Sequence, residues 1–122
     1  EEVRKMKISE IQIFDKSADV NSFKIKGESM WLDKSTRVGL FNSISIEKNA
    51  GKTHTILWYD AVKYVIPIPD ALPMLNEIEM YALNCYNVTQ SHIAAVRSLQ
   101  TIEEIENYDY TVGYPVKLSF PG

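Results

Sequence analysis

Apolar side chains between Asp70 and Gln100 recur at alternating steps of four and three residues, which places them along one face of a helix. The row consists of Ala71, Leu75, Ile78, Ala82, Cys85, Thr89, His92, Val96 and Leu99. Polar side chains occupy the opposite face, as is typical of a helix with one solvated side. The pattern predicts one helix over residues 70–100, with Pro73 in its first turn, where the missing N–H costs little.

Two packing arrangements suit this stripe. Alternation of four and three is also the pattern of a coiled coil, which prefers large aliphatic side chains along its seam. Here the middle of the stripe is small or polar, at Ala82, Cys85, Thr89 and His92. We therefore expect the stripe to pack on the protein's own sheet and helices, with contact between copies as the alternative.

The N-terminal part of the chain predicts strands and turns. Residues 1–7 are charged, and we expect a frayed lead-in there. Residues 8–14 are interpreted as a first strand because apolar side chains gather at Ile11, Ile13 and Phe14. We assign residues 1–14 to this lead-in and first strand, and residues 15–122 to a single domain.

A small antiparallel meander is expected next. Apolar Phe23 and Ile25 alternate with polar neighbours, which predicts a strand over residues 22–26. A tight turn at Gly27 then leads into a short strand over residues 29–32.

Residues 33–51 fit two structures. Ile44 and Ile46 alternate as in a strand, whereas Val38, Phe41 and Ile44 fit one face of a helix. Gly39 weakens the helix by about 1 kcal/mol relative to alanine. We favour a helix over residues 35–49 and leave the strand open.

The remaining elements complete an α+β fold. Residues 53–59 and 62–66 predict a hairpin that turns at Asp60–Ala61, because both are rich in β-branched and aromatic residues. Thr101 and Glu104 form a capping-box pattern that opens a short helix ending near Asn107. We expect a small antiparallel sheet and hairpins packed against the long helix and one or two shorter helices.

Composition limits the partners. A net charge of −3 gives no electrostatic case for nucleic acid, and no apolar run approaches the roughly 18 residues of a membrane span. The single cysteine, Cys85, excludes an internal disulfide and any multi-cysteine metal site. The chain begins at Glu1 and not at methionine, so we expect a processed product or part of a longer protein.

Few residues suggest chemistry. Gly51-Lys52-Thr53 resembles the end of a phosphate loop, but position 46 is isoleucine where that motif needs glycine, and the expected order is helix, loop, strand. A helix end is the favoured interpretation. Asn87-Val88-Thr89 matches a glycosylation triplet but lies mid-helix.

Histidines and acids have structural interpretations too. His92 and Cys85 share a helix face but are too far apart for direct thiol–imidazole catalysis, so we expect His92 to be a hydrogen-bonded core residue and His54 to be exposed. An acidic cluster near the short helix suits its dipole better than acid–base work; it comprises Glu103, Glu104, Glu106 and Asp109. We assign no catalytic residue, no metal ligand, no cofactor and no binding residue.

Seven tryptophan and tyrosine residues could build a recognition surface. We expect about half of them to fill the core and the rest to be available for recognition, since Tyr and Trp are favoured at interfaces. They are Trp31, Trp58, Tyr59, Tyr64, Tyr108, Tyr110 and Tyr114.

Phrases along most of the chain carry a family resemblance. They are VNSFKIKGESMWLDKSTRVGL, TILWY, MLNEIEMYALNCYNVTQSHIAAV and IEEIENYDYTVGYPVKLSF, in which Gly27, Trp31, Asp33, Thr36-Arg37 and Trp58 precede a long helix in a fixed order. This layout resembles a small domain of unknown function found in bacteriophage and prophage tail and tail-fibre proteins. The resemblance supplies no catalytic residues and favours the helix over residues 35–49.

The resemblance implies a non-enzymatic structural domain of a virion, assembled in the bacterial cytoplasm and acting by contact with other phage proteins. A homo-oligomer is expected if it belongs to a fibre. The alternative is a secreted or periplasmic small-ligand binding module, which requires an aromatic-lined pocket of roughly several hundred Å³. An enzyme is the least favoured of the three.

Overall fold

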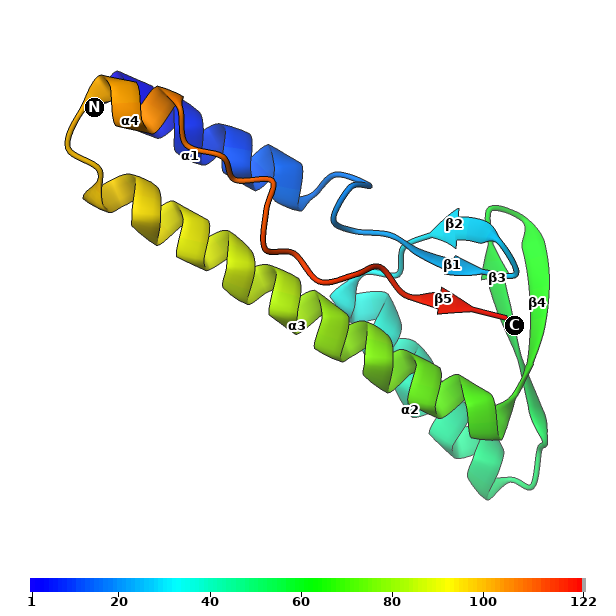
Figure 1. The fold of residues 1–122 in the computed structure, drawn as a ribbon. Helices are drawn as coiled ribbons and strands as arrows, with labels where there is room; N and C mark the ends of the chain where they lie inside the picture. Colours follow the sequence, from blue (N-terminus) through cyan, green and yellow to red (C-terminus); the bar gives the residue numbers. More distant parts are fainter. Residues whose placement is uncertain (122) are drawn as a thin grey trace. The chain divides into compact units, whose positions relative to one another are not determined.

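The computed structural model describes residues 1–121 and shows an α+β protein, as predicted (Figure 1). The elements in order are α1 (Glu2–Asp15), β1 (Phe23–Ile25), β2 (Glu28–Met30), α2 (Lys34–Asn49), β3 (His54–Tyr59), β4 (Val62–Pro67), α3 (Ile68–Ser98), α4 (Ile102–Glu106) and β5 (Ser119–Phe120). The chain divides into two compact units. Unit 1 holds Glu1–Ser22 and Ala82–Lys117, and unit 2 holds Phe23–Tyr81 and the segment from Leu118.

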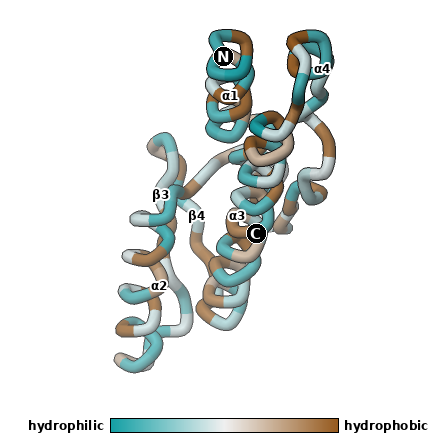
Figure 2. Tube along the Cα trace, turned by 90° about the vertical axis from the view of Figure 1, so that its left-hand side faces the viewer, coloured by the Kyte–Doolittle hydropathy of each residue, from teal (hydrophilic) through white to brown (hydrophobic). Residues whose placement is uncertain are grey.

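The predicted long helix is confirmed as α3, which runs without a break in Figure 1. Seven of the nine predicted stripe positions are buried and the other two, Ala82 and Leu99, are half-buried. Hydrophobic and hydrophilic segments alternate along the tube of α3 in Figure 2, as an amphipathic helix requires. The stripe therefore packs on the protein's own elements, which was the favoured arrangement.

Unit 1 joins α1, α4 and the second half of α3. Arg4 of α1 donates hydrogen bonds from Nη1 to the carbonyl oxygens of Val96, Arg97 and Leu99, at 2.6, 3.0 and 3.1 Å. These carbonyls lie at the end of α3, where helical partners run out, so Arg4 acts as a C-terminal cap. The buried apolar cluster of this unit is Ile11, Ile93, Val96 and Ile105.

The predicted lead-in and first strand over residues 1–14 is wrong, because this segment is the helix α1. Val3, Ile8 and Ile11 are the side chains that pack into the cluster of unit 1. Their spacing fits a helix face, whereas the strand prediction relied on Ile13, which is 68% exposed. The charged residues at the start also favour helix, since Glu, Arg, Lys and Met have high helix propensity.

Unit 2 contains both sheets. Strand β1 pairs antiparallel with β2, as expected, but its other edge pairs in parallel with β5. The β5 pairing is made by the N–H groups of Lys24 and Lys26, which donate to the carbonyls of Leu118 and Phe120. An exclusively antiparallel sheet was expected, so the parallel pair corrects that detail. The core of this unit consists of Phe23, Ile25, Met30, Leu32, Ile44, Leu57, Tyr64, Ile66, Ile68, Ala71, Met74, Leu75 and Ile78.

The ambiguous segment is a helix, α2, which confirms the favoured interpretation of residues 35–49. Ile44 is buried and Leu40 packs against the core, whereas Val38, Phe41 and Ile46 are exposed. Its apolar side chains therefore point in more than one direction, and this explains why the sequence also fitted a strand.

The predicted hairpin is confirmed as β3 and β4, with Tyr59 paired to Val62. Asp60 and Ala61 form its two-residue turn with φ angles of 50° and 62°. Two positive φ values are typical of a type I′ turn, which matches the twist of the strands and favours Asn-Gly or Asp-Gly. Ala61 thus occupies a position that glycine adopts without steric cost.

We expect Ala61→Gly to raise the free energy of unfolding by about 0.5–1 kcal/mol. Relief of the left-handed conformation contributes about 1–2 kcal/mol, and the greater freedom of glycine in the unfolded chain offsets part of it. Urea denaturation followed by circular dichroism would measure the change. The control is Ala50→Gly, at a φ of −82°, which we expect to destabilise; equal effects of the two substitutions would contradict the assignment of strain to Ala61.

Candidate functional site

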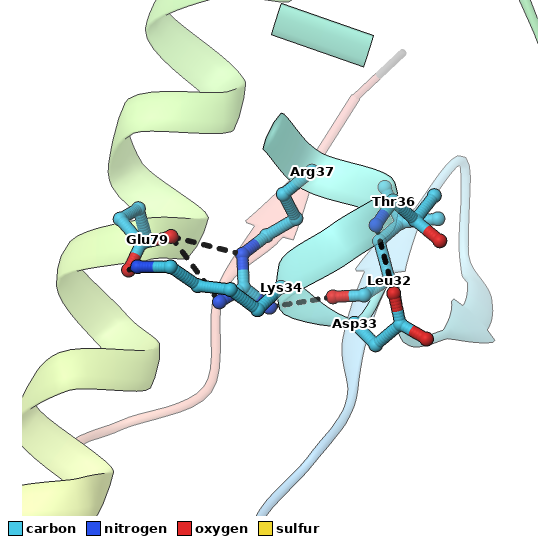
Figure 3. Close-up of polar contacts among 6 residues, drawn as sticks. All are labelled: Leu32, Asp33, Lys34, Thr36, Arg37 and Glu79. Atoms are coloured by element: carbon cyan, nitrogen blue, oxygen red, sulfur yellow. Dashed lines mark hydrogen bonds and ion pairs between the residues drawn. The ribbon is translucent and has the colours of Figure 1, made fainter. Parts of the chain in front are cut away.

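One part of the sequence that carried the family resemblance, residues 31–37, leads into the first turn of α2, and Figure 3 shows Asp33, Thr36 and Arg37 there. The Oδ1 atom of Asp33 accepts a hydrogen bond from the N–H of Thr36 at 2.8 Å, which makes Asp33 the N-cap. That backbone hydrogen bond is the main reason why the pKa of Asp33 lies below its ordinary value. Asp33 and Thr36 therefore have a structural role at the start of the helix.

Arg37 is the buried charge of this segment, with 6% of its surface exposed. Its Nη1 donates to the carbonyl oxygen of Leu32 at 2.6 Å, and its Nε and Nη2 donate to Oε1 of Glu79 at 3.3 and 3.2 Å (Figure 3). The guanidinium also lies 5.4 Å from the centre of the Trp31 ring, a cation–π distance. Arg37 thus links the start of α2 to α3.

Glu79 receives a second cation. Lys34 Nζ lies 3.0 Å from Oε2 of Glu79, so each carboxylate oxygen has its own partner. The hydrogen bond from Lys34 and the charge of Arg37 hold the pKa of Glu79 below its ordinary value, against the effect of burial. Beside this ion pair, a groove of about 640 Å³ runs between α2 and α3 and includes Val38 and Phe41.

The hairpin presents a largely apolar surface to solvent. Side chains alternate along both strands, and Thr55, Leu57, Tyr64 and Ile66 are buried on one face. We call the opposite face the hairpin face; it consists of Ile56, Trp58, Lys63 and Val65. Ile56 pairs across the strands with Val65, and Trp58 with Lys63. Trp58 is 61% exposed, and Ile56 and Val65 are each 47% exposed.

The expected phosphate-loop order is absent from the Gly51 region, as the sequence analysis anticipated. The segment follows α2 and precedes β3, and the N–H groups of Ala50, Gly51 and Lys52 donate to carbonyl oxygens of the last turn of α2. These backbone donors are therefore unavailable for a phosphate. Gly51 has a φ of +86°, as is common for glycine just after a helix end.

His92 is a hydrogen-bonded core residue, as predicted. Its Nε2 lies 2.8 Å from the carbonyl oxygen of Val112, and its Nδ1 lies 2.6 Å from the hydroxyl of Tyr108. A carbonyl oxygen only accepts, so Nε2 carries a proton and donates to Val112. Both ring nitrogens are engaged by the segment that follows α4.

The tyrosines of residues 108–114 face the interior of unit 1. Tyr114 donates to Oγ1 of Thr89 at 2.6 Å, because that hydroxyl in turn donates to the carboxylate of Asp15 at 2.7 Å. Tyr110 donates to Glu10 at 3.3 Å. Burial raises the pKa of Tyr108, Tyr110 and Tyr114. Of the aromatic residues considered for recognition, Trp58 is the one that is mostly exposed.

The other candidates have internal roles. Glu104 completes the capping box with Thr101, as predicted, and hydrogen bonds from the N–H groups of Gln100 and Thr101 lower its pKa. Asp109 accepts from Thr111. Thr89 of the glycosylation triplet is buried. Cys85 is buried on the α3 stripe, and residues 1–121 hold no group of three side chains suited to a metal ion.

No more than one Phe, Tyr or Trp side chain lines each of three large cavities in the described part of the chain. The groove between α2 and α3 has Phe41, a cavity of about 340 Å³ has Phe120, and a pocket of about 600 Å³ at the start of α3 has none. None of these three cavities is therefore lined mainly by aromatic side chains, as the ligand-binding alternative requires.

Comparison of the chain with protein-family models, with curated proteins and with solved structures found no match. Among residues 1–121, no helix is both long enough and apolar enough to cross a membrane.

The sequence analysis missed three structural contacts. Arg4 and Lys7 lie in the segment expected to be a frayed lead-in, and the backbone carbonyls to which they donate are about a hundred positions away in the chain. The Arg37–Glu79 pair spans 42 positions. The one local signal was the Thr36-Arg37 pair within the resembling segment.

We expect Arg37→Met to lower the free energy of unfolding by about 1–3 kcal/mol, because the Leu32 carbonyl loses its buried donor. Methionine keeps an apolar stem against Trp31. The control is Lys34→Met, whose side chain is 70% exposed and pairs with the same carboxylate. An exposed pair contributes about 0–1 kcal/mol, so urea denaturation should separate the two variants. Equal losses would contradict a special role for Arg37.

The lowered pKa of Glu79 also predicts that the stability of the fold depends on pH. Its folded-state pKa lies below the ordinary value of 4.5, so the carboxylate stabilises the fold fully above that pH and loses this effect as the pH falls through the folded-state pKa. We expect Glu79→Gln to be less stable than wild type near neutral pH, with the gap shrinking in acid. Glu77→Gln, at an exposed position, controls for loss of charge. A gap that grows in acid would refute the argument.

Proposed function

We propose that this chain is a non-enzymatic structural domain of a bacteriophage or prophage particle, associated with the tail or tail fibre. Two observations support the proposal. The order of Gly27, Trp31, Asp33, Thr36-Arg37 and Trp58 before a long helix resembles a domain of phage tail proteins. The hairpin face is suited to contact with another protein.

The hairpin face is the observation on which the proposal chiefly rests. Its apolar side chains are neighbours across two paired strands, so they form one patch. An apolar patch exposed on a folded protein is typical of a protein-interaction surface, and tryptophan is enriched among the residues that dominate binding energy. The patch also has a cation, Lys63, beside Trp58.

The polar residues support a structural role. Arg37, Glu79, His92 and Glu104 each have hydrogen-bond partners within their own unit. Such groups position helices and loops. The proposed partners are other phage structural proteins, in a particle assembled in the bacterial cytoplasm, with further copies of this chain if it belongs to a fibre.

We expect Trp58→Ser to abolish incorporation of the chain into particles while the domain remains folded. Trp58 is exposed, so its removal costs little folding free energy but deletes the largest side chain of the hairpin face. The measurement is quantitative mass spectrometry of particles purified after prophage induction from bacteria that encode either form. Circular dichroism of the purified variant would verify folding.

The matched control is Val116→Ser, because Val116 is 90% exposed and is not part of the hairpin face. It should be incorporated at the wild-type level. Wild-type chain missing from abundant particles would refute the virion assignment, whereas normal incorporation of Trp58→Ser would refute the hairpin face as the contact. A monomer at high concentration would argue against the fibre version.

A further inference from the structure

A pocket of about 600 Å³ lies where the end of α2, the start of β3 and the first turns of α3 meet. This volume is within the range of roughly 300–1,000 Å³ found for small-molecule sites. The lining is mostly apolar, and its apolar residues are Ile68, Leu72 and the prolines at 67, 69 and 73. The polar residues that also line the pocket are Lys48, Lys52, Thr53, His54 and Asn76.

The charged side chains that line this pocket are basic. Lys48 and Lys52 line it, and no acidic side chain does so in the described part of the chain. Glu47 is the nearest competitor, since its Oε2 lies 3.7 Å from Lys52 Nζ. Its Oε1, however, accepts a hydrogen bond from the buried Thr55 at 2.7 Å, which holds this carboxylate toward β3. The second cation, Lys48, makes no ion pair with any carboxylate among residues 1–121.

Hydrogen bonds also hold the loop that carries the polar lining residues Thr53 and His54. The Oγ1 of Thr53 lies 2.9 Å from Nδ1 of His54, and the N–H of Ile68 donates to the carbonyl of Thr53. These bonds fix the loop against the first turn of α3. Since the backbone N–H groups of residues 50–52 are bound to carbonyl oxygens of α2, the cationic side chains of Lys48 and Lys52 are the groups that would hold an anion here.

We propose that this pocket binds a small amphipathic anion, with a carboxylate or phosphate head near Lys48 and Lys52 and an apolar body against Leu72 and the prolines. Charge complementarity sets the sign of the head, because hydrogen bonds between an ammonium and an anionic oxygen are among the stronger ones. The apolar lining of the pocket favours a ligand with a hydrophobic body, since burial of apolar area stabilises the complex.

The test is a titration of the ¹⁵N-labelled full chain followed by two-dimensional NMR, with decanoate and decyl phosphate as probes. We expect shifts at residues 48–54 and 67–76, with binding at least roughly tenfold tighter than for decanol, which lacks the charge. Added salt should weaken binding of the anions and leave decanol unchanged. Decyltrimethylammonium, which has the opposite charge, should not bind in this pocket.

The variant that decides is Lys48→Met combined with Lys52→Met, which we expect to reduce affinity for both anions at least roughly tenfold. Lys63→Met, on the hairpin face, is the matched control and should bind as wild type. Phosphate and carboxylate sources are distinguished by which probe binds more tightly. Vesicles containing phosphatidic acid distinguish a membrane lipid from a free molecule, because only the former would sediment the chain.

Three outcomes would overturn the proposal. These are equal binding of decanol and the anions, shifts that map outside residues 48–54 and 67–76, and no binding by any probe at millimolar concentration. None of them bears on particle incorporation, which tests the hairpin face.

Discussion

The buried stripe of α3 is the constraint on which both hydrophobic clusters depend. Its first turns supply Ile68, Ala71, Met74, Leu75 and Ile78 to the core of unit 2, and its last turns supply Ile93 and Val96 to the cluster of unit 1. Between them the stripe becomes polar at Thr89 and His92, where the tyrosines of residues 108–114 bind. One helix thus meets two requirements: apolar packing near both ends and hydrogen bonding between them.

The elements that the sequence predicted correctly are those whose signals lie within a few neighbouring residues. Periodicity, turn residues and capping patterns each involve residues that are close in sequence. They predicted the long helix, the β3–β4 hairpin and the Thr101–Glu104 cap. Helix α1 was missed although its periodicity was present, because the charged residues around Val3 and Ile8 were interpreted as frayed. Its stability depends on Ile105 and other residues far along the chain.

At the candidate sites, too, local features could be predicted from the sequence and distant partners could not. The engagement of His92 followed from its place on an apolar stripe, but its partners did not, since Tyr108 and Val112 approach it only after the chain reverses. Arg37 was visible within the resembling segment, yet nothing local indicated Glu79. The hairpin face could not be predicted, because the sequence does not show which side of the hairpin is covered. Ile56 and Leu57 are both apolar, yet Ile56 is exposed and Leu57 is buried.

The parallel pairing of β1 with β5 has a consequence for how the chain acquires its structure. Lys24 pairs with Ser119, so 95 further residues must be synthesised after Lys24 before β1 gains its second neighbour. The β1–β2 hairpin is local and can form early, whereas contacts between distant segments close slowly because of their entropic cost. Until then one edge of β1 offers unpaired N–H and C=O groups to any other strand. This edge of β1 therefore exposes a nascent chain to aggregation until β5 covers it.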